Sequence, residues 1–111
     1  MIEKIICDYL NTKLSVPVYM EEQKNKTESY VLIEKTGSSE NNYIYSAMIA
    51  IKSYAGTLYE AASLNERVKD VMRNIIELGE VSKCKLNSDY NFTDPETKRY
   101  RYQAVFELTY Y

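Results

Sequence analysis

Histidine is absent from this chain, and that absence removes most familiar catalytic arrangements. Histidine is the commonest general base and the usual activator of serine and cysteine nucleophiles. Ser-His-Asp and Cys-His arrangements therefore cannot form within one chain. The three glycines are not spaced as a phosphate-binding loop. Two cysteines do not make a usual zinc site, which needs four ligands. We expect no catalytic residue, no metal and no cofactor.

Pairs of carboxylates are the remaining generic option for catalysis. Glu21 and Glu22 fall in a polar stretch, and Asp94 and Glu96 flank a proline in a turn. Acid-base catalysis needs a carboxylate held in a fixed place beside the substrate. Because both pairs fall in segments expected to be solvated and flexible, we interpret them as contributing solubility and turn formation.

A basic strip near the end of the chain could contact nucleic acid. Lys98, Arg99 and Arg101 are interleaved with Tyr100 and Tyr102, and cations beside stacking aromatics are typical of such surfaces. On a strand, however, the arginines and tyrosines point to opposite faces. The net charge of −2, from 14 basic and 16 acidic residues, favours neither nucleic acid nor an anionic membrane as main partner. A solvated outer face and ion pairing between subunits are the alternatives.

The two cysteines, Cys7 and Cys84, lie far apart in the sequence with apolar neighbours, and we predict two buried thiols. A disulfide is the alternative, although it is unusual for a chain without an export signal. The N-terminus lacks a basic region followed by an apolar one, and no apolar run is long enough to span a membrane. We therefore expect synthesis in the cytoplasm and no membrane partner.

A long strand with one buried face is predicted at the end of the chain. From Tyr100 to Tyr110 almost every second residue is apolar or aromatic, which is the period of a strand. The turn before it, Asp94–Thr97, has Pro95 at the favoured second position. Similar patterns predict a helix at 2–13, an edge strand at 16–20, strands at 29–36, 43–54 and 81–90, and loops at 21–28 and 37–42.

Apolar residues at helical spacing predict one long helix, Leu58–Leu78. Thr57 is a favourable N-cap, Glu60 completes a capping box, and Gly79 is a natural stop. Asn65 interrupts the apolar stripe. We expect the following helix residues to be buried against Tyr102, Ala104 and Phe106 of the last strand: Val68, Val71, Met72, Ile75 and Ile76.

Strands on both sides of one long helix predict a single α+β domain over residues 1–111. We expect an antiparallel sheet of about four main strands, with the long helix and a short N-terminal helix packed on it. The polar loops at 21–28 and 37–42 should be the most mobile segments. Tyrosine is in excess, with 12 Tyr against 2 Phe and no Trp, which suits half-buried surfaces and interfaces, although sheets also favour aromatic residues in general.

This order of elements resembles the small tail-terminator, or tail-completion, proteins of long-tailed bacteriophages and prophages, which are also labelled minor tail or minor capsid proteins. The resemblance covers nearly the whole chain, although Ser29 stands where the family often has a proline. It is carried by the N-terminal helix leading into Val16–Tyr19, by Tyr30–Ile33, by Met48–Tyr54 running into a helix, and by the ending Phe92–Thr97 followed by Arg101, Tyr102 and Phe106.

The resemblance implies a structural protein of the virion that is made in the cytoplasm of a bacterial host. Its subunits would form a ring, usually of six, that caps the tail tube and joins it to the head. Its partners would be further copies of itself, the tail tube protein and the head-completion protein. Alternatives are another head-tail connector or baseplate subunit, a non-viral cytosolic module that binds peptides by strand addition, and an enzyme.

The contact between ring subunits is predicted partly by elimination. The features in excess are sheet, tyrosine and free sheet edge, and a heterologous interface closes into a ring when its rotation allows. The predicted contact joins the outer face of the last strand to the loop before the second long strand. Its residues are Arg99, Arg101 and Gln103 from the strand, and Glu40, Asn41 and Asn42 from the loop. We expect both arginines to be solvated in the monomer.

Overall fold

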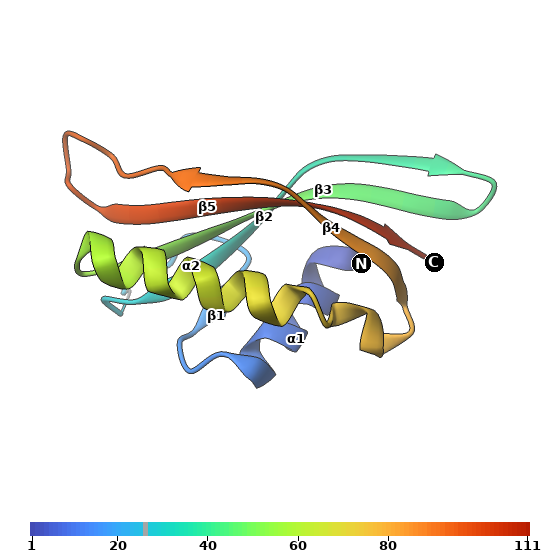
Figure 1. Ribbon diagram of the computed structural model, residues 1–111, viewed down its shortest axis with the longest axis horizontal. Coiled ribbons are helices and arrows are strands. Elements are labelled where there is room, and N and C mark those ends of the chain that lie inside the picture. Colours follow the sequence, from blue (N-terminus) through green and yellow to red (C-terminus); the bar gives the residue numbers. More distant parts are fainter. Residues whose placement is uncertain (26) are drawn as a thin grey trace.

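The computed structural model describes residues 1–25 and 27–111. The elements are α1 (Ile2–Lys13), β1 (Val18–Tyr19), β2 (Tyr30–Asn41), β3 (Ile44–Ala55), α2 (Leu58–Met72), the 3-10 helix η1 (Ile75–Leu78), β4 (Val81–Asn91) and β5 (Tyr100–Tyr110). Figure 1 shows two layers, with both α-helices on one face of the sheet and the other face uncovered.

The sheet has five strands in the order β1-β2-β3-β5-β4. All pairings are antiparallel except that of β1 with β2, which is parallel. The predicted α+β class is confirmed. The four long strands pair antiparallel, as expected, whereas the short β1 adds a fifth, parallel strand that makes the sheet mixed. The cause is the connection from β1 to β2, which is long enough to bring β2 back alongside β1 in the same direction.

The core lies between the sheet and the helices. Ile6 and Leu10 of α1, Val68 of α2, and Ala104 and Phe106 of β5 belong to one buried cluster. The predicted period of two in β5 is confirmed, because Ala104, Phe106 and Leu108 are all at most 2% exposed. The predicted N-cap is also confirmed, since Thr57 Oγ1 accepts from the Glu60 amide at 3.1 Å.

The long predicted helix is confirmed from Leu58 to Met72 and wrong after Met72. The α-helix ends at Met72, and Ile75–Leu78 form a separate 3-10 turn that ends at Gly79 with φ of 77°. Asn74 breaks the helix: its amide bonds Val71 O at 3.1 Å, and its side chain donates to Asp70 O at 3.4 Å. The break turns Ile76 outward, so that it is 53% exposed, whereas Ile75 remains buried.

The predicted loop at 37–42 is also wrong. Strand β2 continues through these residues after a bulge between Lys35 and Gly37, and only Asn42 and Tyr43 form the turn to β3. Glycine, serine and asparagine have low strand propensity, but pairing with β3 overrides it. The hairpin consequently extends beyond the helix layer, at one end of a molecule of 44 × 25 × 25 Å (Figure 1).

The cysteines are free, so the alternative of a disulfide is excluded. Both are half-buried rather than fully buried. Cys7 Sγ donates to Val18 O at 3.4 Å, and burial raises the pKa of Cys84 to about 11. Both thiols are therefore protonated near neutral pH and serve as small packing groups.

Candidate functional site

A cluster of tyrosine rings lies on the uncovered face of the sheet, at the end where β5 begins. Tyr30 of β2 and Tyr54 of β3 are paired in register, and their rings stack with centroids 4.5 Å apart and planes 8° apart. Tyr19 of β1 adds a tilted ring 6.1 Å from that of Tyr30. Tyr30 and Tyr54 are only 2% and 4% exposed, although no helix covers this face.

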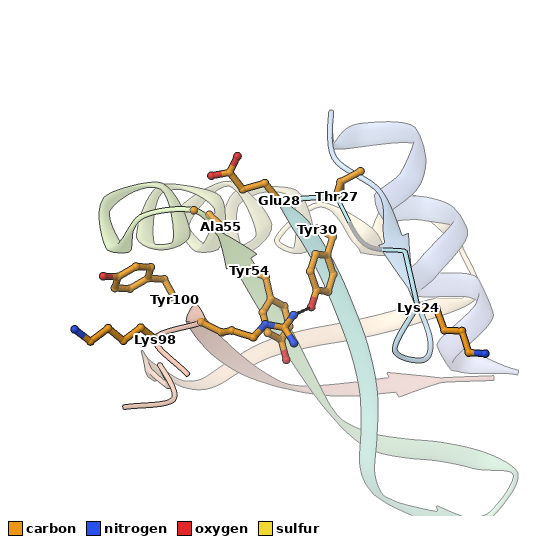
Figure 2. Close-up of a pocket in the computed structure, with 10 residues that line it drawn as sticks. Lys24, Thr27, Glu28, Tyr30, Tyr54, Ala55, Lys98 and Tyr100 are labelled. Atoms are coloured by element: carbon orange, nitrogen blue, oxygen red, sulfur yellow. Dashed lines mark hydrogen bonds between the residues drawn. The ribbon is translucent and has the colours of Figure 1, made fainter. Parts of the chain in front are cut away.

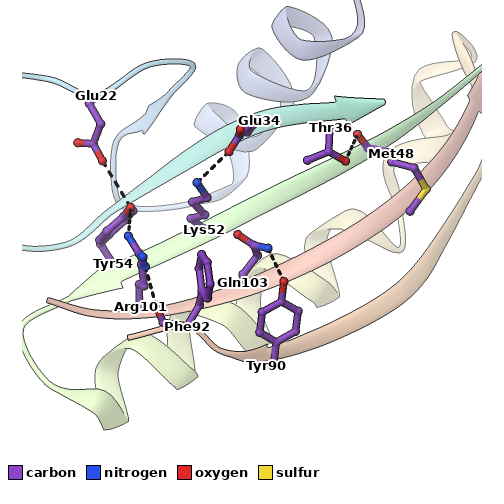
Figure 3. Close-up of polar contacts among 10 residues, drawn as sticks. All are labelled: Glu22, Glu34, Thr36, Met48, Lys52, Tyr54, Tyr90, Phe92, Arg101 and Gln103. Atoms are coloured by element: carbon purple, nitrogen blue, oxygen red, sulfur yellow. Dashed lines mark hydrogen bonds and ion pairs between the residues drawn. The ribbon is translucent and has the colours of Figure 1, made fainter. Parts of the chain in front are cut away.

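The two arginines of the predicted contact complete this cluster. The Arg99 guanidinium carbon lies 5.0 Å from the Tyr54 ring centroid, and Arg99 Nη2 donates to Tyr30 Oη. The Arg101 guanidinium lies 4.5 Å from the Phe92 ring, with Nε donating to Phe92 O at 2.6 Å and Nη1 to Tyr54 Oη at 3.2 Å (Figure 3). The expectation that both arginines are solvated is therefore wrong, because aromatic rings and hydroxyl groups hold them against the sheet.

Glu22, from the loop between β1 and β2, ties that loop to the cluster. Tyr54 Oη donates to Glu22 Oε1 at 3.4 Å, and Tyr30 Oη lies 3.5 Å from Glu22 Oε2. Each phenol therefore bridges the carboxylate and one guanidinium. Figure 3 shows the bridge made by Tyr54. Burial raises the pKa of Tyr30 to about 12. The segment 21–28 is a loop as predicted, with Lys26 outside the described residues, and its predicted mobility stays a prediction.

A cavity of about 420 Å³ opens beside the stacked rings. Figure 2 shows Tyr30 and Tyr54 at its centre, with Lys24 and Lys98 on either side. A Cβ at Gly56 would lie 1.7 Å from Glu28 Oε1, so glycine there gives the Glu28 side chain room. The cavity is lined by Lys24, Thr27, Glu28, Tyr30, Tyr54, Ala55, Gly56, Lys98, Arg99 and Tyr100.

The tip of the β2–β3 hairpin is the second unusual surface. Asn42 and Tyr43 both have positive φ, of 53° and 66°. Tyr43 is 84% exposed, and Ile44 beside it is 46% exposed. Behind the tip, Tyr45 stacks on Tyr110 with centroids 5.6 Å apart, which anchors the hairpin to β5. The tip therefore presents an aromatic and an aliphatic side chain to solvent from a fixed base.

The residues of the predicted contact do not form one patch. Glu40, Asn41 and Asn42 lie at the hairpin tip, while Arg99 and Arg101 lie at the cavity end. The twelve residues of β3 connect these ends, a span of roughly 36 Å at about 3.3 Å per residue. Gln103 lies between, only 8% exposed and donating to Tyr90 Oη at 2.6 Å (Figure 3), so it offers little surface to a partner.

The sheet also has free edges. β1 pairs with β2 only at Val31 and Leu32, so across the described residues the outer side of β2 from Ile33 onward carries no further strand. Val31 donates outward to Pro17 O at 2.9 Å. Because donors alternate along a strand, the amide of Lys35, beyond the end of β1, also points to the open side. An extended segment could continue the sheet there.

Sequence patterns did not predict the stacked tyrosines, the place of Glu22, the cavity or the exposed Tyr43 at the hairpin tip. The only sequence signal was the excess of tyrosine. In the described ranges, no three histidine, cysteine or carboxylate side chains are grouped to hold a metal ion. No described helix is long and apolar enough to cross a membrane.

The cavity beside the Tyr30–Tyr54 stack and the tip of the β2–β3 hairpin are the features from which we infer a function. No protein-family model and no curated protein matches the sequence.

Proposed function

We propose that this protein is a structural subunit of a bacteriophage or prophage tail, of the tail-terminator kind. Copies of the chain form a closed ring of six that sits on the tail tube and joins it to the head. The partners are neighbouring copies, the tail tube protein and the head-completion protein, and the place of action is the virion. The proposal joins the family resemblance of the sequence to the surfaces described above.

One observation carries the proposal: the subunit has two unlike exposed surfaces at opposite ends of its long axis. A ring is built by a heterologous contact, in which one surface of a subunit meets a different surface of the next. The hairpin tip and the cavity beside Tyr54 are such a pair, separated by the length of β3. A two-fold dimer would instead need a single self-complementary patch.

Deletion of the gene from its phage or prophage tests the proposed role. We expect electron microscopy to show filled heads and free tails that remain unjoined. Purified protein added to the extract should restore joined particles. Normal particles from the deleted phage would refute the proposal. Sedimentation velocity of the purified chain supplies the second readout, since a ring of six copies of the 13.0 kDa chain is easily separated from a monomer.

The free edge of β2 favours a second candidate, a module that binds an extended peptide by strand addition. Beyond the end of β1, this edge borders a cavity of about 320 Å³ lined by Glu3, Met20 and Lys35, among others. Peptides selected from a random library on the purified protein would test it. If they bind the edge, Lys35→Pro should abolish binding by removing an outward amide, whereas Lys35→Thr, which keeps the amide, should not.

A further inference from the structure

We infer that Tyr43 of one subunit inserts into the cavity beside the Tyr30–Tyr54 stack of the next subunit. This inference rests on the proposed ring and names its contact. It assigns an anchor side chain to the hairpin tip and a receptor site to the opposite end of the sheet. The occupant of the cavity is therefore a second copy of this chain.

Tyr43 is poorly explained by the fold of a single subunit. At φ of 66° a bulky side chain is a backbone outlier, and hairpin turns with two positive φ values favour glycine at this position. A strained residue persists where it gains something else, often at a binding site. Within the monomer Tyr43 gains little, because 84% of its surface is exposed. An aromatic side chain held at a projecting tip has the geometry of an interface anchor.

The cavity suits a tyrosine side chain in size and in chemistry. Its volume of about 420 Å³ leaves room for one phenol ring and the backbone on either side of it. The Arg99 guanidinium and the Tyr100 ring line it and offer cation-π and aromatic contacts to an incoming ring. Tyr30 Oη and the Tyr54 ring hold the Arg99 guanidinium in place. Among the described ion pairs none involves Arg99, so none of those carboxylates neutralises its charge.

The charges of the two ends are complementary. The cavity is lined by three cations, Lys24, Lys98 and Arg99, against one carboxylate, Glu28. The hairpin tip carries the exposed carboxylate of Glu40 and no cation between Thr36 and Lys52. A tip that approaches the cavity therefore brings negative charge to a positive rim, which speeds encounter and helps to set orientation. The same pairing makes two tips, or two cavities, repel each other.

Tyr43→Gly is the first test, because it removes the anchor and suits the turn better. We expect the melting temperature of the monomer to rise, since glycine relieves the positive φ. We expect the subunit contact to weaken on the order of 30-fold, the effect of losing about 2 kcal/mol at a hot spot. Tyr59→Ala is the matched control, because Tyr59 is 81% exposed on the outer side of α2 and should leave association unchanged.

A mixing experiment tests the direction of the contact. Lys98→Glu alters the cavity rim at an exposed residue and should leave the fold intact. Each variant alone, Tyr43→Gly or Lys98→Glu, should stay monomeric by sedimentation velocity. Their mixture should form dimers, because the first retains a normal cavity and the second a normal tip. Where the unaltered chain assembles in free solution, a mixture without dimers, or a Tyr43→Gly variant that assembles like the unaltered chain, would overturn the inference.

A weak contact remains measurable if the ring forms only on the tail tube. At millimolar concentrations of the unaltered chain, the amide NMR shifts of Tyr43 and Arg99 should change with concentration. In the Tyr43→Gly variant the Arg99 shift should not depend on concentration. Shifts that do not depend on concentration would overturn the inference. The proposed function is judged separately by the gene deletion: unjoined particles with a normal Tyr43→Gly rescue would keep the function and reject this contact.

Discussion

Removing the Arg101 side chain should destabilise the monomer, in contrast to the expectation from sequence. Arg101→Ala deletes two hydrogen bonds, to Phe92 O at 2.6 Å and to Tyr54 Oη at 3.2 Å. It also removes the guanidinium from the Phe92 ring, 4.5 Å away, and from the Tyr54 ring, 5.8 Å away. Phe92 is already 39% exposed and would lose the guanidinium that lies over its ring.

The size of the effect follows from these contacts. Each hydrogen bond contributes roughly 1 kcal/mol net, and a partly exposed cation-π contact about 0.5–1 kcal/mol. Arg101 is half-buried, so water replaces part of what is lost and the sum must be reduced. We expect a loss of about 1–3 kcal/mol. Arg101→Glu should cost more, because it adds a carboxylate to a cluster that already holds Glu22.

Urea unfolding followed by circular dichroism measures this loss. At a slope of about 1–3 kcal/mol per molar urea, the midpoint should fall by roughly 1 M. Arg67→Ala is the matched control, since Arg67 is exposed on α2 and its midpoint should hardly move. Arg101→Lys should fall between the two, because it keeps the charge but cannot make both hydrogen bonds. Equal midpoints for the Arg101→Ala and Arg67→Ala variants would refute the reasoning.

Three further predictions concern the fold that carries the two surfaces. The folded pKa of Tyr30, about 12, exceeds its unfolded value of 10.0, so its contribution to stability should fall as pH rises from 10 to 12, and Tyr30→Phe should flatten the pH dependence of unfolding. Ile75→Ala should cost about 2–5 kcal/mol in denaturant unfolding, but Ile76→Ala well under half of that. Thr57→Ala should cost roughly 1 kcal/mol and lower the melting temperature.

The elements with strong periodicity could be predicted from the sequence because local pattern and tertiary burial agree. Helix α1 has the predicted bounds of 2–13, and the start of α2 and the alternation of β5 are as expected. The end of α2 could not be predicted, because apolar spacing continues through Ile75 and Ile76 while the side chain of Asn74 bonds the helix backbone. A competing hydrogen bond of this kind leaves no trace in hydrophobic periodicity.

The tyrosine-arginine cluster could not be predicted from local pattern at all. Glu22, Tyr30, Tyr54 and Arg99 come from four segments, and they meet only because β2, β3 and β5 pair in one particular register. Alternation correctly predicts that Arg99 and Arg101 lie on the face away from the helices. It does not indicate that a loop residue and two rings cover this face, so solvation was the natural but incorrect expectation.

The turn at Asn42 and Tyr43 could not be predicted from the sequence, because its second residue is a tyrosine where such turns favour glycine. Asn-Gly between two strands would have predicted a two-residue hairpin at once, whereas Asn-Tyr reads as part of a polar loop. A tyrosine in the left-handed region costs on the order of 1–2 kcal/mol, and its burial here recovers little of that cost. Selection for stability alone would favour glycine at position 43. The departure from the turn rule therefore supports the proposed contact, in which the Tyr43 side chain of one copy enters the cavity at the opposite end of another copy.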